Sequence, residues 1–238
     1  MPDRKTAIVT GAERGIGAGL VEGFLKNGYN VVGTSLNANE SLTASPSLIP
    51  IDGDIAKPET AAKVVEAAMG HFGTVDVLVN NAGIYRTKPF TEFTDEDFKA
   101  LFSINLLGFC YMTQLAVKQM LKQKSGNVVT ITASLADQPV ASIRASVSMI
   151  TKGGLNTVTR HLAIEYAKEG IRFNAVAPGV VDTALHKDDP KDSLRSAQPM
   201  GKIVEIKDIV DAVLYLAQAD QVTGEIIHVD GGSHAGRW

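Results

Sequence analysis

The chain has 238 residues, of which 45% are hydrophobic and 21% charged, so it can bury a sizeable core and global disorder is excluded. Its net charge of −3, with no block of lysines or arginines, argues against a nucleic-acid partner. The single cysteine, Cys110, cannot form a disulfide within the chain, which suits a reducing compartment, and we expect it to be a small buried hydrophobe.

The start of the chain has no cationic segment followed by an apolar one, and no run reaches the roughly 18 consecutive apolar residues of a membrane span. We therefore expect a soluble cytoplasmic protein. We expect no metal centre.

Short apolar runs recur along the chain and predict strands. The runs are rich in β-branched residues and nearly uninterrupted, rather than alternating with polar residues. This pattern is typical of strands that are buried on both faces of a parallel sheet. In chain order the predicted strands are 6–10, 30–34, 47–51, 75–80, 127–132, 172–177 and 225–230.

Segments with helical spacing lie between these runs. Gly28 and Gly73 follow two of them as helix stops, and Pro58 stands near the start of one. The segment after Thr94 opens with an acidic first turn and is apolar on more than one side, which indicates burial against another subunit as well as the sheet. The alternation of strand and helix predicts one doubly wound α/β domain with about seven parallel strands. The predicted helices are 14–27, 57–73, about 95–123 and about 148–169.

A glycine-rich turn follows the first predicted strand and opens the first helix. Gly11, Gly15 and Gly17 have the spacing G-x-x-x-G-x-G. Glycines permit a tight turn and a close approach of the backbone, and a helix N-terminus presents free N–H groups to a pyrophosphate. A tight turn without a ligand would also contain glycines, but the position directly after a strand favours a dinucleotide.

Five motifs connect the sequence with a known family. They are TGAERGIG (10–17), NNAG (80–83), SINLLG (103–108), VAPGVVDT (176–183) and VTGEIIHVDGG (222–232). Each is weak alone, but together they cover essentially the whole chain, which resembles the short-chain dehydrogenases/reductases, and most of all the β-ketoacyl-carrier-protein-reductase-like branch. The resemblance implies a single Rossmann-type domain with a cofactor half (about 1–125) and a catalytic and substrate half (about 126–238). It also implies hydride transfer between a nicotinamide cofactor and a small molecule.

The corner after the second strand bears on the choice of cofactor. In the family, an acid at the end of that strand binds the ribose and selects NAD. Here the corner carries Thr34 and Ser35, with no acid along the chain before Glu40, which leaves room and hydroxyl donors for a 2′-phosphate. Arg14 resembles the basic residue that NADP-using relatives place before Gly15, where the helix dipole otherwise slightly disfavours it. NADP(H) is therefore predicted over NAD(H).

The resemblance implies further cofactor contacts. Asp54 resembles the aspartate beside the adenine ring, although a turn residue ahead of a helix would look the same. Thr183 and the backbone of Val181, which follow Pro178 and Gly179, resemble the contacts to the nicotinamide carboxamide. The other predicted cofactor-binding residues are Ile16, Asn81, Ala82, Gly83 and Lys152, and Asn80 is expected to brace the central strands.

The catalytic positions match the family only in part. The resemblance implies a tyrosine that protonates the alkoxide and a lysine four residues on that lowers the pKa of the tyrosine. It also implies a serine that binds the carbonyl oxygen and an asparagine that anchors a water. Asn105 and Lys152 match two of these. Ser134 is the best candidate for the serine, although its spacing is one residue longer than expected, and Thr132 is the alternative. The tyrosine position is Ser148.

A serine does not replace a tyrosine as an acid. A phenol titrates near ~10 and an aliphatic hydroxyl close to water, at roughly 15.7. Loss of general acid catalysis typically lowers a rate by about 10²- to 10⁴-fold. The shorter side chain of Ser148 also predicts a gap, the size of an aromatic ring, in which substrate or water could sit.

Three hypotheses remain for the reaction. In the first, the protein is a reductase whose proton comes from water near Lys152, from Tyr85 or from His186, although the last two also fit ordinary loop residues. In the second, the substrate is an iminium or activated alkene, which needs no protonated oxygen. In the third, the protein binds NADPH without turnover, as a sensor or structural subunit. The presence of both Lys152 and Asn105 favours the first two.

The last part of the chain bears on substrate and assembly. Segment 184–203 follows Thr183 and is predicted to be a mobile lid over a modest substrate. Exposure of the large apolar side chain of Trp238 to solvent would be unfavourable, and relatives pack this end of the chain across a subunit interface. Together with the two long helices, it predicts a homotetramer, with a homodimer as the alternative.

Overall fold

A computed structural model describes residues 4–183, 190–196 and 198–236. It contains a seven-stranded sheet in which every strand is parallel to its neighbours, in the order β3-β2-β1-β4-β5-β6-β7. The doubly wound α/β fold is thus confirmed, and each predicted strand is present to within two residues at either end. The strands are β1 (Thr6–Thr10), β2 (Asn30–Ser35), β3 (Leu48–Asp52), β4 (Val77–Asn80), β5 (Gly126–Ile131), β6 (Ile171–Pro178) and β7 (Ile226–Val229).

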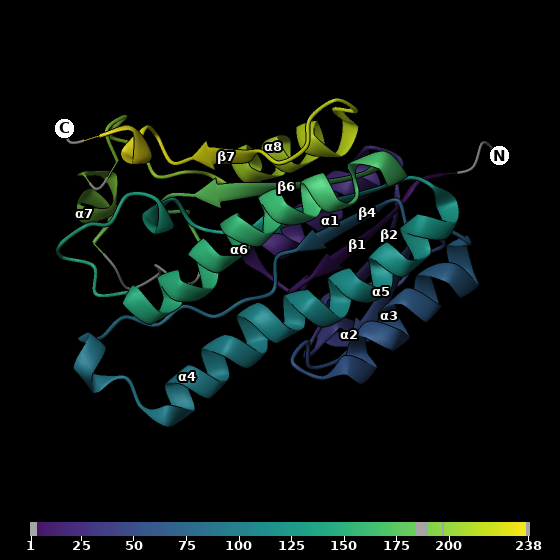
Figure 1. The fold of residues 1–238 in the computed structure, drawn as a ribbon, viewed down its shortest axis with the longest axis horizontal. Helices are drawn as coiled ribbons and strands as arrows, with labels where there is room; N and C mark the ends of the chain where they lie inside the picture. The colour runs from purple at the N-terminus through teal and green to yellow at the C-terminus, as the bar shows by residue number, and fades with distance from the viewer. Residues whose placement is uncertain (1–3, 184–189, 197, 237–238) are drawn as a thin grey trace.

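Helices cover both faces of the sheet (Figure 1). One face carries α1 (Gly15–Lys26) and α8 (Ile206–Gln218), and the other carries α3 (Pro58–Phe72), α5 (Gly108–Gln123) and α6 (Ser146–Glu165). The shorter α-helices are α2 (Ala38–Ser41), α4 (Asp95–Phe102) and α7 (Lys191–Ser196). The single 3-10 turns are η1 (Phe90–Glu92), η3 (Ser134–Ala136), η4 (Ala167–Glu169) and η6 (Ser233–Ala235), and η2 (Ser103–Leu107) is a π-helix.

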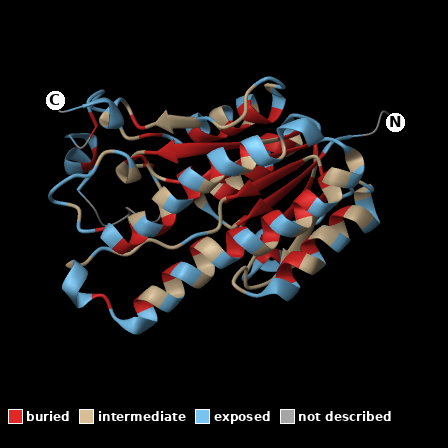
Figure 2. Cartoon of the chain, viewed as in Figure 1, coloured by how far each residue is buried: buried red, intermediate tan, exposed pale blue. Residues whose placement is uncertain are grey.

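The uninterrupted apolar strands follow from this two-sided covering. Successive residues of a strand point to opposite faces. In β1, Val9 belongs to the core beneath α1 and α8, whereas Ile8 belongs to the core beneath α3 and α5. All five residues of β1 are therefore buried. Figure 2 shows the buried strands between helices whose outer faces are exposed.

The helix ends follow the predicted chemistry. Pro58 is the first residue of α3, and Gly73 ends that helix in the left-handed conformation at φ 76°. Gly28, which follows α1, also has a positive φ of 80°. Thr94 caps α4, because its side chain accepts the Asp97 N–H while the Asp97 carboxylate accepts the Thr94 N–H.

α4, η2 and α5 form one continuous helical stretch, Asp95–Gln123. Among the residues that the structure describes, it is the one helix that is long and apolar enough to cross a membrane by length and composition alone. Its Met112 and Ala116 are buried in the core beneath α3 and α5, so a core helix accounts for this composition. Cys110 is exposed, and its predicted burial is wrong, because it lies about 200° around the helix from Met112.

Candidate active site

The predicted site residues lie at the carboxyl ends of the strands, where open α/β sheets bind ligands. The turn after β1, the segments after β4, β5 and β6, and the helices η2 and α6 all contribute to this region. The strand order changes direction between β1 and β4, which is the switch point expected for a dinucleotide site.

Two glycines of the turn after β1, Gly11 and Gly17, are too closely packed to carry a side chain. A Cβ on Gly17 would lie 1.9 Å from the Gly11 carbonyl oxygen, and a Cβ on Gly11 would lie 3.0 Å from the Ala82 Cα. Gly11 and Gly15 have positive φ angles of 65° and 54°. This close backbone packing is what a pyrophosphate cradle at the start of α1 requires, so these residues fit a dinucleotide.

Thr10 joins this turn to the segment after β4, and the sequence reasoning missed it. Its hydroxyl oxygen accepts the N–H groups of Asn81 and Ala82, both at 3.0 Å. In return, the Asn81 side-chain amide donates to the carbonyl oxygens of Thr10 (2.9 Å) and Gly11 (3.2 Å). The threonine directly before the first glycine of the turn was the available signal. The first two motifs therefore form one rigid unit.

The corner after β2 contains unsatisfied hydroxyl groups. The side-chain oxygens of Thr34 and Ser35 are buried and have no hydrogen-bond partner within the described part of the chain. Asp52, paired in register with Ser35, brings a carboxylate here that the sequence reasoning missed because it looked only along one strand. Hydrogen bonds from the side chain and backbone of Asn39 hold the pKa of Asp52 below its usual value.

Two predicted cofactor residues flank Gly15 at the start of α1. Arg14 is the N-cap residue, and its side chain is 79% exposed, with the guanidinium 3.7 Å from the Glu13 carboxylate. Ile16 is partly buried and packs against the core beneath α1 and α8. Arg14 is therefore free to turn toward a ligand, whereas Ile16 has a packing role.

The segment after β6 returns to the glycine turn. A Cβ on Gly15 would lie 3.6 Å from the Thr183 Cγ2, so the predicted nicotinamide end and the pyrophosphate turn are neighbours. A parallel β-bridge joins Val181 to Val204 through the backbone groups on either side of Val181. In this pattern the N–H of Val181 itself faces away from the bridge and is available to a ligand.

Asp54, Pro178 and Gly179 also have structural roles. The Asp54 carboxylate accepts the Ala56 N–H at 2.9 Å in the turn before α3. Pro178 ends β6, and a Cβ on Gly179 would lie 2.8 Å from the Asp230 Cα. Local structure thus accounts for these residue types, and their cofactor contacts stay predictions.

The Lys152 ammonium group lies at the end of β5. It donates to the Ile131 carbonyl oxygen at 2.8 Å, and a Cβ on Gly83 would lie 3.3 Å from the Lys152 Nζ. Part of the lysine side chain stays exposed, but burial of the ammonium group lowers the pKa of Lys152 from 10.5 to about 8. The lysine is thus a cation that loses its proton near physiological pH.

Asn105 lies in the π-helix η2 and is buried. Its amide oxygen accepts the Ile84 N–H at 2.8 Å, and its amide nitrogen donates to the Ile84 carbonyl oxygen and to the Thr151 hydroxyl, both at 3.0 Å. π-helical turns are frequent at functional sites because they reorient one residue within a helix. Asn105 thereby fixes the segment that follows β4 beside Lys152.

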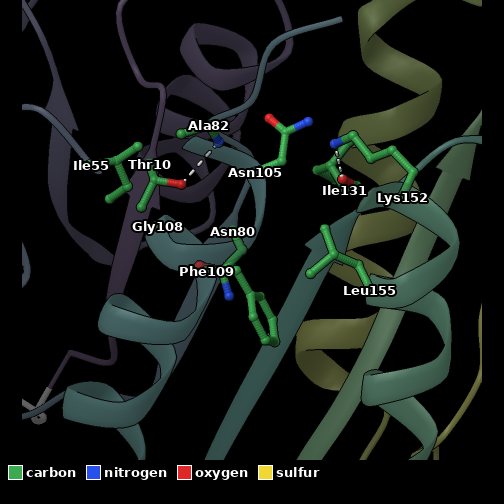
Figure 3. Close-up of a pocket in the computed structure, with 10 residues that line it drawn as sticks. All are labelled: Thr10, Ile55, Asn80, Ala82, Asn105, Gly108, Phe109, Ile131, Lys152 and Leu155. Atoms are coloured by element: carbon green, nitrogen blue, oxygen red, sulfur yellow. Dashed lines mark hydrogen bonds between the residues drawn. The ribbon is translucent and has the colours of Figure 1, made fainter. Parts of the chain in front are cut away.

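A small cavity lies between these groups (Figure 3). Thr10, Asn80, Asn105 and Lys152 supply its polar lining, and it offers about 10 Å³ to the centre of a water-sized sphere. Such a space has room for about one water molecule. Asn80 also donates to the Thr113 hydroxyl at 2.9 Å, which braces β4 against α5, and its bracing of the central strands stays a prediction.

Ser148 is fully buried in the first turn of α6. Its hydroxyl donates to the Arg86 carbonyl oxygen at 2.9 Å and accepts the Arg86 N–H at 3.0 Å. The predicted gap beside Ser148 is therefore wrong, because the main chain at Arg86 lies against the hydroxyl. With its one proton donated to a backbone carbonyl, this hydroxyl is not poised to act on a substrate.

The structure separates the two candidates for the carbonyl-binding serine. Ser134 is buried in η3, just after β5, and its hydroxyl has no hydrogen bond to the described part of the chain. The Thr132 hydroxyl donates to the Val176 carbonyl oxygen in β6 at 3.3 Å, so the alternative is not supported. Tyr85 is partly buried, which raises the pKa of its phenol. His186 lies outside the described residues, as does Trp238.

Comparison with known proteins identifies the family. A family model described as enoyl-(acyl carrier protein) reductase matches residues 11–234. The 3-oxoacyl-[acyl-carrier-protein] reductase FabG of Buchnera aphidicola subsp. Baizongia pistaciae is 32% identical over 241 residues, which cover 97% of this chain and 98% of that protein. The chain belongs to the short-chain dehydrogenase/reductase family.

Solved short-chain dehydrogenase/reductase structures share the fold. The structure "ElxO with NADP Bound" has a TM-score of 0.91 at 28% identity and covers 98% of this chain and 100% of its own. A 3-ketoacyl-(acyl-carrier-protein) reductase from Brucella melitensis, complexed with NADH, has a TM-score of 0.91 at 29% identity, with coverages of 97% and 98%. The predicted enzyme class is confirmed: the chain is a dehydrogenase/reductase with a nicotinamide cofactor.

An ion-pair cluster around one buried carboxylate holds the segment after the NNAG motif of this short-chain dehydrogenase/reductase. The side chains of Arg86 and Lys88 both bind the Asp97 carboxylate, which is 4% exposed. The Lys88 ammonium, the Thr94 N–H and the Arg86 guanidinium hold the pKa of Asp97 well below its usual range. No pattern in the sequence indicated this cluster, because its members lie in a loop and a helix cap.

We expect Asp97→Asn to lower the free energy of unfolding at pH 7. We also expect this free energy to decrease less on acidification in Asp97→Asn than in the wild type. Because the pKa of Asp97 is depressed in the folded protein, its stabilisation is present above the unfolded pKa of about 4 and disappears as the pH falls below it. Urea unfolding at pH 7 and pH 3 measures both effects. Asp95→Asn is the matched control, since in the described structure that exposed carboxylate pairs with the exposed Lys99 and with no buried cation. A parallel loss of stability on acidification in wild type and Asp97→Asn would contradict the prediction.

Proposed function

We propose that this protein is an NADP(H)-dependent reductase of a small molecule with a carbonyl-type group, an imine or an activated alkene, and that it works without a phenol acid. The observation that carries the proposal is the partly buried Lys152 ammonium group, held beside Asn105 and the Ile131 carbonyl oxygen at the carboxyl ends of the strands. A reduced nicotinamide cofactor, with its pyrophosphate held in the glycine cradle, would supply the hydride.

Among these acceptors, the charge of Lys152 favours a carbonyl. A fixed cation stabilises the negative charge that develops on a carbonyl oxygen when hydride is added to its carbon. An iminium carbon, by contrast, brings a positive charge that the ammonium repels, so it suits only the deprotonated lysine. Ser134, whose hydroxyl has no hydrogen-bond partner among the described residues, is the second group available to the oxygen.

Features of the adenosine corner support NADP(H) over NAD(H). Thr34 and Ser35 provide hydroxyls in place of an acid at the end of β2, and the nearby Asp52 is already engaged by Asn39. Arg14 is exposed and able to reach a 2′-phosphate.

We therefore expect Arg14→Ala to weaken NADPH binding about tenfold, the effect of one charge-assisted hydrogen bond, and to leave NADH binding unchanged. Fluorescence titration of both cofactors gives the dissociation constants. Lys26→Ala, which removes an exposed cation from the other end of α1, is the matched control. Tighter binding of NADH than of NADPH by the wild type would refute the cofactor choice.

The reductase proposal is tested by NADPH oxidation at 340 nm against a panel of ketones, aldehydes, cyclic imines and activated alkenes. We expect turnover with at least one carbonyl compound, and about 10²- to 10⁴-fold slower turnover of the same compound by Lys152→Ala. A wild type that binds NADPH but oxidises it with no member of the panel would overturn the proposal.

A second candidate function is a non-catalytic NADP(H)-binding protein, a sensor or a structural subunit. The state of Ser148 favours it, because the hydroxyl at the tyrosine position is taken up by the backbone of Arg86. This candidate function requires that the protein bind NADPH without oxidising it steadily. The same panel of acceptors therefore distinguishes the non-catalytic protein from the reductase.

We also propose a homotetramer, with a homodimer as the alternative. The outer faces of η2 and α6 expose Leu107, Ile150 and Ile164 at 44%, 51% and 80%, which is unfavourable for a monomer in water. Light scattering that gives only the 25.3 kDa of one chain would contradict this assembly.

A further inference from the structure

Ser148 binds the backbone in an unusual way for a serine in a helix. Hydroxyls in helices usually return to a carbonyl of their own preceding turn, as Thr159 does with Leu155 at 2.8 Å. Ser148 instead reaches Arg86, which is 62 residues away along the chain, and satisfies both the N–H and the C=O of that residue. The Ser148 hydroxyl thus forms both backbone hydrogen bonds of Arg86 that a neighbouring strand would form in a sheet.

A second side chain binds the main chain in the same way at Ile84, two residues before Arg86. The Asn105 amide satisfies both the N–H and the C=O of Ile84. The two clamps are connected, because Asn105 donates to the Thr151 hydroxyl at 3.0 Å, and that hydroxyl donates to the Ser148 carbonyl oxygen at 2.7 Å. Alternate residues of one segment are therefore fixed to η2 and α6 by one closed network.

The clamped segment leads directly to the lysine. Gly83 immediately precedes Ile84, and a Cβ on Gly83 would lie 3.3 Å from the Lys152 Nζ and 3.2 Å from the Asn105 amide oxygen. We propose that Ser148 is a positioning residue: by binding Arg86, it holds segment 83–86 against the Lys152 ammonium group. The inference deepens the proposed function, since it concerns the same lysine.

This role explains how a serine serves the site without being an acid. While segment 83–86 is held beside Lys152, it limits the water that reaches the ammonium group, and burial is the cause that lowers the pKa of Lys152. When the clamp is lost, water must solvate the freed backbone groups of Arg86, and the same water reaches Lys152.

The role also predicts that a tyrosine cannot simply be restored at position 148. The main-chain N and O atoms of Arg86 lie 3.0 Å and 2.9 Å from the Ser148 hydroxyl oxygen, and Ser148 is fully buried, so an aromatic ring attached there on the same rotamer would meet this main chain. Ser148→Tyr must therefore displace segment 83–86, and we expect it to open the site rather than to complete it.

The test uses the whole chain without cofactor or substrate and has two readouts. The first is the pKa of Lys152, from a pH titration of the ¹³Cε signal of labelled lysine, assigned with Lys152→Arg. The second is the hydrogen-exchange rate of the Arg86 amide. In Ser148→Ala we expect the Lys152 pKa to rise from about 8 toward 10.5 and the Arg86 amide to exchange roughly tenfold faster or more.

Ser148→Thr keeps the hydroxyl and is expected to keep both values, while Ser148→Tyr is expected to behave like Ser148→Ala. Ser146→Ala is the matched control, because Ser146 is an exposed serine in the same turn of α6 whose hydroxyl has no partner among the described residues. If Ser148→Ala does not fold, Ser148→Cys, which weakens both hydrogen bonds, replaces it, and we expect the same two changes at smaller size.

The proposal is overturned if the folded Ala or Cys variant keeps the wild-type Lys152 pKa, or if Ser148→Thr shifts it as far as Ser148→Ala does. It is also overturned if the Arg86 amide in Ser148→Tyr stays as protected as in the wild type. Neither readout involves turnover. An absence of reductase activity would therefore refute the proposed function and leave this inference standing. An unchanged Lys152 pKa in Ser148→Ala would refute this inference and leave the proposed function standing.

Discussion

Lys152→Ala is expected to lower kcat/KM for NADPH-dependent reduction by about 10²- to 10⁴-fold, the range for loss of a positioned acid or electrostatic group. The lysine is the one cation beside both Asn105 and the end of β5 in the described structure. Its removal leaves a developing oxyanion with no fixed positive charge. Stopped-flow or steady-state absorbance at 340 nm measures the loss.

The pH dependence of the wild-type reduction rate also tests whether the Lys152 ammonium group assists the reaction. Because the ammonium form is the one that assists, the rate of reduction is expected to be level below pH 8 and to fall as the pH rises through the Lys152 pKa of about 8. Lys152→Arg keeps a charge at all working pH values, so any residual activity is expected to lack this fall. A wild-type rate that increases above pH 8 would contradict the assignment.

Stability provides an independent check of the same pKa. The folded pKa of Lys152 is lower than the unfolded value of 10.5, so protonation favours unfolding. This destabilisation is fully present below about pH 8 and is relieved as the pH rises toward 10.5. Relative to Lys152→Met, which never carries the charge, the wild type is therefore expected to gain stability between pH 8 and pH 10.5. Urea midpoints of the two proteins across that range measure the difference.

Gly17→Ala is expected to abolish measurable cofactor binding and to destabilise the fold by about 1–3 kcal/mol, the usual effect of overpacking. Its new Cβ would lie 1.9 Å from the Gly11 carbonyl oxygen, which is backbone and cannot rotate away. The turn and α1 must therefore move apart, which destroys the cradle. Calorimetric titration with NADPH and thermal unfolding measure the two effects.

Gly70→Ala is the matched control for this substitution. Gly70 lies within α3, and a Cβ there would meet nothing within 4 Å. Alanine loses less conformational entropy on folding than glycine, so this variant is expected to gain about 0.4–1 kcal/mol and to bind NADPH normally. Equal cofactor affinity in both variants would show that the turn after β1 is not the cofactor site.

The fold was predictable because its signals are local. Strands such as β1 are apolar along their whole length because neighbouring residues face two different cores, and glycines and caps mark the helix ends. The roles expected of Lys152 and Asn105 came from the resemblance to the family, whose motifs carry both residues, and the structure brings the two to the carboxyl ends of the strands.

The contacts of Ser148 could not be predicted in this way. The serine was visible, but its partner is the main chain of Arg86, which any residue type would supply and which no sequence pattern therefore marks. The gap expected from side-chain size alone is filled by the main chain of the loop that follows β4. The exposure of Cys110 was missed for a related reason, since the buried face of a helix that is apolar on several sides depends on how it docks.

The π-helical turn that holds Asn105 has a further consequence for how this enzyme can vary. A π-turn contains one residue more than the α-helical path needs, so deleting a single residue within η2 would convert it to ordinary α-helix and leave α5 in register with the core. Met112, Ala116 and Met120 would then stay buried, whereas Asn105 would lose the orientation in which it binds Ile84 and Thr151. The extra residue of this turn therefore serves the site and not the core, so a chain without it would keep the fold and lose the position of the active-site asparagine.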